Sequence, residues 1–376
     1  MSEYQRYEFM TVDRPLTSTQ LDAVNSLSSH IEASSTHALI EYNWGSFKHD
    51  PIKVLHGFFD GFLYWANWGS PELALRFPHG ILPEDLIESY DFYDFVEFTH
   101  HPDYDILDIH FGELEGPDEW IDYQLGSLIA IRDELMEGDL RSLYLTWLAA
   151  QCLAGYEEED EADMIIPPVP SAFGELTAAQ QALAELLQVP QELLMAAAQH
   201  SKAAGPSTRD DFAAWVELLP QARRNEYLVR LAHNEPGLSR VLVKELRELG
   251  RGTQHATPPP GECVSYATLS AESKSIKARL AREKREQEQL AHQRHLQHIH
   301  DHQDEYWRQV DQAVSRGSGS GYDEAVQLLT ALREAADQFK ESQAFQTSFR
   351  AWIRPHLRRP ALLKRLQDRK FTLPEA

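Results

Sequence analysis

The sequence predicts an α+β fold: a small mixed sheet with helices, followed by an all-α helical region that includes one long polar helix. Two observations carry this prediction. Strand and helix patterns alternate from residue 4 to residue 111 in the order β-α-β-α-β-β-β. Beyond a proline-rich break near residue 170 the strand patterns stop, and the apolar residues that follow have helical spacing.

The expected elements of the first domain follow in chain order. A strand over 4–12 leads to a helix that begins at Thr17, whose side-chain oxygen can cap the first turn. His37–Trp44 alternates as a strand does. Asp50 followed by proline is a helix-start signal, and we expect that helix to continue through Trp65. The next strands are expected at 72–77, 95–99 and 104–111, and two helices broken at 137–139 are expected over 119–153.

Two breaks divide the chain. Residues 157–161 form a self-repelling acidic run, and the prolines of 167–170 cannot continue a helix. A second break lies at 250–261, which holds three consecutive prolines. The expected parts are an acidic α+β domain over 1–156, an acidic and proline-rich linker over 157–172, a helical domain over 173–250, a proline-rich linker over 251–266, and the long helix plus a basic C-terminal helical segment over 267–376.

The negative charge is confined to the first part of the chain. The 376 residues carry a formal net charge of −24. Residues 1–166 hold 33 acidic and 7 basic side chains, whereas residues 167–376 hold 26 acidic and 28 basic ones. Such a domain either engages a basic protein partner or simply uses its charge for solubility. With no leader pattern at the N-terminus and no apolar run of about 20 residues, we expect a cytoplasmic protein without membrane contact.

Carboxylates gather around the last expected strands. Asp103 and Asp105 share a strand face, whereas Asp108 falls on the other. Their acidic neighbours are Glu97, Glu113 and Glu115. The group suggests a metal-dependent hydrolase or nuclease as an alternative function. Acidic strand ends explain the same pattern without catalysis, so we assign no catalytic residue and keep Asp103, Asp105 and Asp108 as the alternative.

Histidines are dense on the expected long helix. His298 and His302 are one turn apart, and His295 lies a further turn back, which is a chelating geometry for zinc, nickel or copper. An exposed polar helix that tolerates histidines explains the row without a ligand. We therefore expect no cofactor and no stoichiometric transition metal, with these three residues as the alternative metal ligands.

Two tryptophans and a row of arginines are the candidate partner-binding residues. Trp44 and Trp68 each precede a glycine at the end of an element, where they either form a recognition surface or belong to the core. In the basic C-terminal segment, Arg350, Arg354 and Arg358 are four apart and share one helical face. Arg359 continues this row of positive charge. These arginines fit phosphate groups, an acidic protein surface or the protein's own acidic first domain, of which the last is slightly favoured because it would neutralise part of that domain's charge.

The C-terminal segment also carries a resemblance. The stretches YWRQVDQAV, YDEAVQLLTALREAADQF and FRAWIRPHLRRPALLKRLQ, between Tyr306 and Phe371, resemble the C-terminal helical segment of bacterial SWIM zinc-finger family proteins. The Cys-x-Cys and Cys-x-His zinc core of that family is missing, because Cys152 and Cys263 stand alone. The resemblance therefore implies a shared accessory module that engages a common partner, without the zinc or a nucleic-acid role.

Taken together, these patterns favour a non-catalytic binding or adaptor component of a bacterial protein assembly, whose acidic domain engages a basic protein. The first alternative is the metal-dependent hydrolase or nuclease that uses the carboxylates between Asp103 and Glu115. The second is a nucleic-acid-binding protein that makes a weak contact through its basic C-terminal segment.

Overall fold

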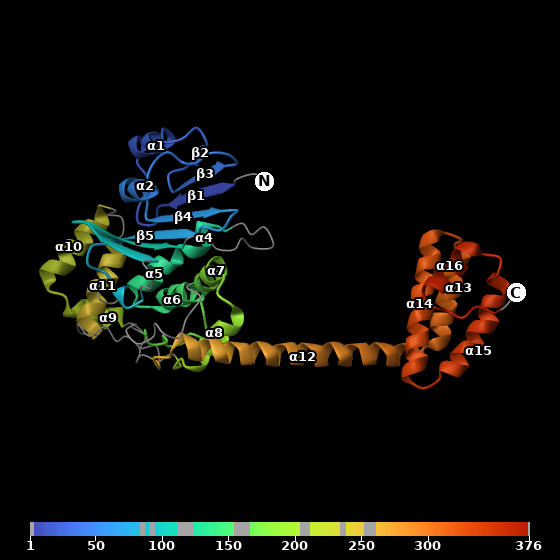
Figure 1. The fold of residues 1–376 in the computed structure, drawn as a ribbon. Coiled ribbons are helices and arrows are strands. Elements are labelled where there is room, and N and C mark those ends of the chain that lie inside the picture. Colours follow the sequence, from blue (N-terminus) through green and yellow to red (C-terminus); the bar gives the residue numbers. More distant parts are fainter. Residues whose placement is uncertain are drawn as a thin grey trace. The chain divides into compact units, whose positions relative to one another are not determined.

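The computed structural model describes residues 4–82, 87–90, 95–111, 123–153, 166–203, 211–233, 238–251 and 261–374. It divides the chain into two compact units, Met1–Lys277 and Ala278–Ala376 (Figure 1). The first unit holds a β-sheet with helices, and the second is helical. The expected α+β class is confirmed.

Within the described residues, seven strands form one sheet in the order β2-β3-β1-β4-β5-β7-β6. Every neighbouring pair is antiparallel, so the sheet is not the mixed one that was expected. The strands are β1 (Gln5–Met10), β2 (Ile31–Ala33), β3 (His37–Tyr42), β4 (Gly61–Ala66), β5 (Glu72–Pro78), β6 (Val96–His100) and β7 (Tyr104–His110).

The helix expected to run from Asp50 through Trp65 is correct only in its first half. Asp50 caps α2 (Pro51–Phe58), as expected from the Asp-Pro pair. The chain then leaves the helix, and residues 61–66 form β4, in the middle of the sheet. Phe62 and Leu63 are both fully buried although they point to opposite faces. A continuous apolar run of this kind fits a buried strand or a buried helix equally well.

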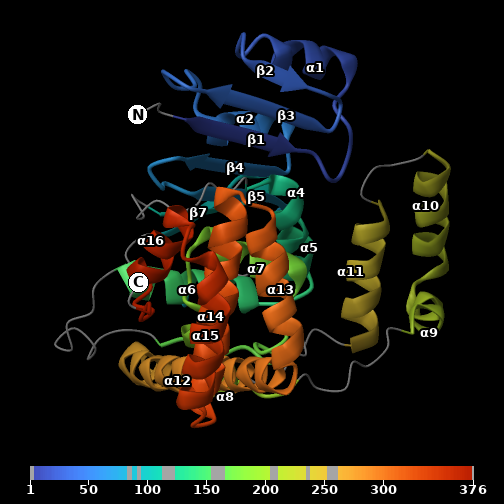
Figure 2. The same ribbon diagram turned by 90° about the vertical axis from the view of Figure 1, so that its right-hand side faces the viewer.

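The two faces of the sheet are covered by different helices. On one face α1 (Ser18–Asn25) and α2 pack over Phe9 and Phe62, in a core that also contains Ile40. On the other face α4 (Leu125–Leu128) and α5 (Ala130–Met136) contact the strands. Behind them lie α6 (Arg141–Leu153) and α7 (Ala178–Leu186), of which α7 contacts α4, α5 and α6 (Figure 2).

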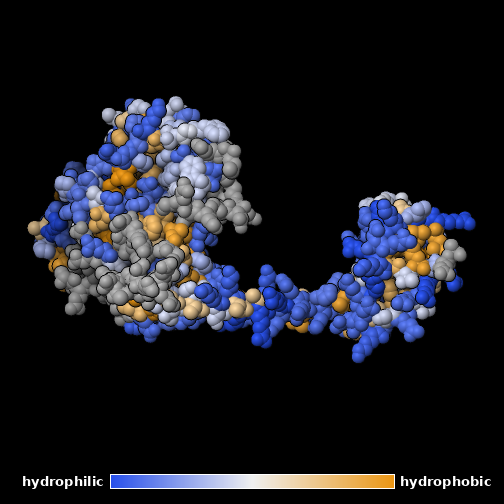
Figure 3. Space-filling view, in the orientation of Figure 1, coloured by the Kyte–Doolittle hydropathy of each residue, from blue (hydrophilic) through white to orange (hydrophobic). Residues whose placement is uncertain are grey.

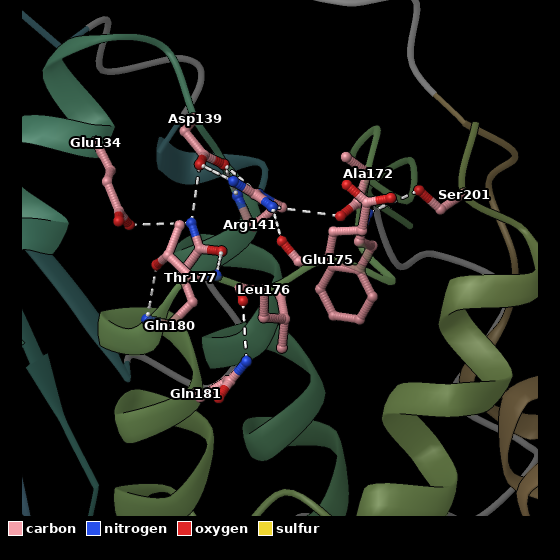
Figure 4. Close-up of polar contacts among 11 residues, drawn as sticks. Glu134, Asp139, Arg141, Ala172, Glu175, Leu176, Thr177, Gln180, Gln181 and Ser201 are labelled. Atoms are coloured by element: carbon pink, nitrogen blue, oxygen red, sulfur yellow. Dashed lines mark hydrogen bonds and ion pairs between the residues drawn. The ribbon is translucent and has the colours of Figure 1, made fainter. Parts of the chain in front are cut away.

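A polar network fastens the segment before α7 to the preceding helices (Figure 4). Arg141 pairs with Asp139 at 2.6 Å and donates to the backbone carbonyl of Glu175, also at 2.6 Å. Gln180, fully buried, donates to Asp139 at 2.8 Å and to Glu134 at 3.0 Å. These side chains come from segments about 40 residues apart, so they hold α7 against the body that contains the sheet.

Among the described residues, four further helices lie wholly within the first unit. They are α8 (Gln191–Gln199), α9 (Phe212–Leu218), α10 (Gln221–Ala232) and α11 (Leu238–Arg251). Leu219, Tyr227, Leu238 and Leu246 form a small core among α9, α10 and α11. Outside this core, α10 exposes Leu228 and Leu231, at 64% and 65%.

The expected long polar helix is divided at His302. α12 (Tyr266–Asp301) begins in the first unit and ends in the second, and α13 (Gln303–Ser315) follows it. Every residue from 281 to 295 is exposed, and this part of α12 is mostly hydrophilic in the space-filling view (Figure 3). Arg282 pairs with Glu286 at 2.8 Å across one turn, a pairing that supports a helix with no core to pack on.

The second unit is a helical bundle. Its remaining helices are α14 (Gly319–Gln338), α15 (Ser342–Ile353), a short 3-10 turn (Arg354–His356) and α16 (Pro360–Asp368). Ile299, Val310, Leu329, Ile353 and Leu362 are fully buried in its core. Among the helices of the described residues, none is long and apolar enough to span a membrane.

Candidate functional site

The structure separates the three aspartates that the sequence singled out. Asp103 is exposed in the turn before β7, Asp105 is fully buried on one face of β7, and Asp108 lies on the opposite face. Asp108 is directly opposite Glu97 of β6. Glu113 and Glu115 lie outside the described residues. The aspartates therefore do not meet at one point, and their geometry gives no support to a shared hydrolase or nuclease centre.

Asp105 instead meets two histidines that sequence reasoning missed. His79 Nδ1 lies 2.9 Å and His100 Nδ1 lies 2.8 Å from Asp105 Oδ1. The backbone N–H of Gly80 donates to Asp105 Oδ2 at 2.7 Å. The ligand atoms of the three side chains all lie within 4.8 Å of one another. We call this group the His79–His100–Asp105 cluster.

Different signals would have been needed to find the two histidines. His100 and Asp105 flank the short turn between β6 and β7, so a hairpin over 96–110 places them opposite each other. His79 is joined to the cluster only because β5 pairs with β7. β5 and β7 are neighbours in the sheet although β6 lies between them in the chain. The local sequence around His79 does not indicate this pairing.

The electrostatics of Asp105 favour its charged form. Burial raises the pKa of its carboxyl group, but the hydrogen bonds from His100, Gly80 and His79 outweigh that effect and hold the pKa below its ordinary value. The carboxylate is fully buried, whereas the side chains of His79 and His100 are 52% and 37% exposed. The cluster is thus a buried anion beneath two imidazoles that reach solvent.

Asp108 is in the opposite situation. Burial and the nearby carboxylates of Glu72 and Glu97 raise its pKa to about 8. Glu72 itself has a pKa raised to about 7, by burial and by Asp50. Within the described residues, Asp108 Oδ1 has no hydrogen-bond partner, and His110 Nδ1 lies 3.8 Å from Asp108 Oδ2. The burial of Asp108 and the carboxyl groups near it thus disfavour its charged form.

The alternative metal ligands on α12 are not brought together. His298 and His302 stack with ring centroids 4.3 Å apart, but His302 Nδ1 donates to the backbone carbonyl of His298 at 2.9 Å. His295, His298 and His302 are all exposed. In the part of the chain that the structure describes, they do not form a cluster with converging ligand atoms.

Of the two tryptophans, Trp44 is the one that faces solvent. Its side chain is 68% exposed, the most exposed large apolar side chain among the described residues, whereas Trp68 is half-buried. The turn that holds Trp44 is anchored, because buried Gln5 donates from Nε2 to the carbonyl of Gly45 at 2.8 Å. Gly45 has a φ of 88°, which favours glycine, and Phe47 packs into the core against Tyr7.

The arginine row is only partly available for binding. Arg350, Arg354 and Arg358 are exposed, but they do not share one helical face as expected. Arg350 lies in α15, Arg354 begins the 3-10 turn and Arg358 lies in the turn before α16, because Pro355 does not let one helix continue through all three. Arg359 is half-buried and donates to the carbonyl of Val314 at 2.5 Å, so it holds α13 and the C-terminal segment together.

Comparison with known proteins gives no relative from which a role could be transferred. No protein-family model matches the chain, no curated protein is significantly similar to it, and no solved structure is significantly similar to its fold. The resemblance of the C-terminal segment to SWIM zinc-finger proteins stays a prediction. What the protein does is therefore inferred from its own side chains.

Proposed function

We propose that this protein is a non-catalytic binding or adaptor component whose acidic first unit engages a basic protein partner around Trp44. The observation that supports this best is the exposure of Trp44 on an anchored turn. Tryptophan is enriched among the residues that dominate binding energy at interfaces. A single exposed apolar side chain is common on protein surfaces, so the support for a binding role comes from the combination of an exposed tryptophan and an anchored turn.

The turn presents Trp44 without further ordering. Its position is held on one side by the hydrogen bond from Gln5 to Gly45 and on the other by Phe47, whose ring centroid is 5.5 Å from that of Tyr7. Because the backbone of this turn is already held, less binding free energy is lost in ordering it when a partner binds. This distinguishes Trp44 from an apolar side chain at the tip of a free loop.

The charges near Trp44 in the sequence fit a basic partner. Glu41 precedes it by three residues and Asp50 follows it by six; their side chains are 44% and 46% exposed, although they also pair with Arg6 and Lys53 of the same chain. An exposed aromatic face attracts lysine and arginine side chains through cation–π interactions, and exposed carboxylates on the same unit attract them through charge. The excess of acidic residues over 1–166 would steer such a partner from a distance.

The test is capture of partners from the native cell by the full-length protein, with quantitative mass spectrometry. A basic protein should bind, bind less at about 0.5 M than at about 0.05 M salt because charges are screened, and lose at least about tenfold in affinity with Trp44→Ala. Leu228→Ala, which removes another exposed apolar side chain of the same unit, is the matched control. A neutral or acidic partner, or equal binding by both variants, would refute the proposal.

A second candidate function rests on the exposed arginines of the second unit. Arg350, Arg354 and Arg358 face solvent and are free to contact phosphates, so a weak nucleic-acid contact by this segment stays a proposal. A cytoplasmic location belongs to the main proposal, and the two free thiols, Cys152 and Cys263, agree with a reducing compartment.

A further inference from the structure

We propose that His79, His100 and Asp105 form a binding site for a divalent transition-metal ion of the zinc class. The two Nδ1 atoms and Asp105 Oδ1 would be the ligands. This site is independent of the binding role proposed for Trp44. It departs from the sequence-based expectation of no stoichiometric transition metal. Of the candidate ligands considered from the sequence it uses Asp105, but neither Asp103, Asp108 nor the histidines of α12.

The fold places the three ligands from three separate segments. In the antiparallel sheet Asp105 of β7 is directly opposite Phe77 of β5 on one side and His100 of β6 on the other. Directly opposite residues share a face, so His100 lies beside Asp105. His79 directly follows β5 and reaches Asp105 Oδ1 with its Nδ1, and Gly80, with a φ of 71°, turns the chain immediately after it.

The two distances from Asp105 Oδ1 are slightly shorter than a bound ion requires, and all three ligand atoms lie within 4.8 Å of one another. Zinc–ligand bonds of about 2.0 to 2.1 Å in a tetrahedron place neighbouring ligand atoms about 3.3 Å apart. The two Nδ1 atoms lie 2.9 Å and 2.8 Å from Asp105 Oδ1. Each imidazole therefore has to retreat by about half an ångström. Both imidazoles are partly exposed, which gives an ion access to the cluster.

The carboxylate is held in the orientation that a ligand needs. Asp105 Oδ2 accepts the backbone N–H of Gly80 at 2.7 Å, which leaves Oδ1 directed at the two histidines. Such backbone support of a ligating carboxylate is the usual outer shell of a metal site. The carboxylate is fully buried, so a divalent cation held between it and the two imidazoles would be bound by charge as well as by coordination.

The ligand set selects the class of ion. Two imidazole nitrogens and one carboxylate oxygen suit zinc and its neighbours such as cobalt and nickel, whereas magnesium and calcium prefer oxygen ligands throughout. Three protein ligands leave at least one position for water or for a group of another molecule, as zinc sites with an open position do.

The experiment uses the untagged full-length protein, loaded with zinc chloride, dialysed, and measured by elemental analysis and by titration calorimetry. We expect one equivalent of zinc that depends on the cluster. His79→Ala should weaken its binding by at least about 100-fold, more than the loss of an outer-shell group does. His100→Ala should do the same. His101→Ala is the matched control, because this neighbouring imidazole packs against Tyr104 with ring centroids 4.5 Å apart and contributes no ligand.

The outcomes separate the possibilities. Cobalt bound by the wild-type protein and the His101 variant, with a visible spectrum that the His79 variant lacks, would support the site. Absence of zinc binding would overturn it, as would equal zinc binding by the wild-type, His79 and His100 variants. A zinc equivalent that is lost in His298→Ala/His302→Ala but kept in His79→Ala would also overturn it, in favour of α12. Circular dichroism checks that each variant is folded. If His100→Ala does not fold, the His79→Ala variant, at an exposed position, provides the test.

Discussion

Two buried aspartates of the sheet region show how neighbours decide what the same side chain does. Asp60 and Asp108 are both largely removed from water, but Asp60 has an arginine and two backbone amides as partners, whereas Asp108 has other carboxylates nearby. Their pKa values move in opposite directions. They should therefore have opposite effects on the pH dependence of stability.

For Asp108 we expect that Asp108→Asn stabilises the first unit at pH 8. The pKa of Asp108 is raised to about 8 in the folded state, so the folded protein holds this proton more tightly than the unfolded chain does. Its contribution to stability is present below about pH 4 and is lost as the pH rises toward 8. The gain at pH 8 should be on the order of 1 kcal/mol or more and vanish near pH 4. Urea unfolding at both pH values measures it, and Asp103→Asn, at an exposed position, should change nothing.

For Asp60 we expect the reverse. Burial raises the pKa of its carboxyl group. The hydrogen bonds from Arg76 at 2.6 Å and from the backbone N–H groups of Asp13 and Val12 lower the pKa by a larger amount, so the net pKa lies below its ordinary value. Its contribution is therefore present above the ordinary pKa and lost as the pH falls below it. Asp60→Ala should cost about 2 to 4 kcal/mol at pH 7, because Arg76 loses its partner. The loss should shrink in acid, and an equal loss at pH 3 and pH 7 would contradict this account.

At the scale of elements, α12 is unusual because its middle packs against nothing in the described part of the chain. Residues 281–295 are exposed, yet Leu296 and Ile299 at its end are buried in the second unit. A helix of this kind depends on its own backbone hydrogen bonds and on pairs such as Arg282–Glu286. Its stability should then be local, and independent of the units on which it begins and ends.

We therefore expect Gln287→Pro to break α12 without unfolding either unit. Proline inside a helix costs about 3 kcal/mol or more, but here no core depends on the residue. Circular dichroism should show a loss of helix while the unfolding midpoints stay unchanged. Ile299→Ala, a few turns further on, should instead destabilise the second unit by about 2 to 4 kcal/mol, because it leaves a cavity in a core. A lowered midpoint in the proline variant would show that the exposed segment has a packing role.

At the scale of the whole molecule, charge and fold divide the chain at different places. The acidic excess ends near residue 166, whereas the first compact unit continues to Lys277. The second unit has its own core of buried residues from α12 to α16. A unit with a separate core should fold alone, and its exposed arginines can then be studied without the acidic unit.

We expect the fragment 278–376 to fold and to bind duplex DNA weakly, with a dissociation constant on the order of 10⁻⁵ M at low salt. Each of Arg350→Glu, Arg354→Glu and Arg358→Glu should remove about one phosphate contact, and so reduce the slope of log affinity against log salt concentration by about one. Lys340→Glu, an exposed cation outside this row, is the control. Fluorescence anisotropy measures the dissociation constant and its dependence on salt. If the folded fragment binds no DNA at low salt, the row serves protein contacts instead.

Local patterns were enough for much of this fold. The strands at Glu72–Pro78 and Tyr104–His110 and the capped starts at Thr17 and Asp50 follow from alternation and from side-chain caps, which involve residues close in the chain. The charge of the first part and the exposed, polar character of α12 are also properties of the sequence. These features determine the α+β class without knowledge of which elements touch.

The tertiary structure decided what depends on distant neighbours. Whether Phe62 and Leu63 belong to a helix or to a strand depends on β1 and β5, which lie on either side of them in the sheet. Whether Asp105 meets His79 depends on the pairing of β5 with β7. Which tryptophan faces water depends on what packs around each one. Strand order and burial are set by the free energy of the whole core, and no short stretch of sequence contains that information.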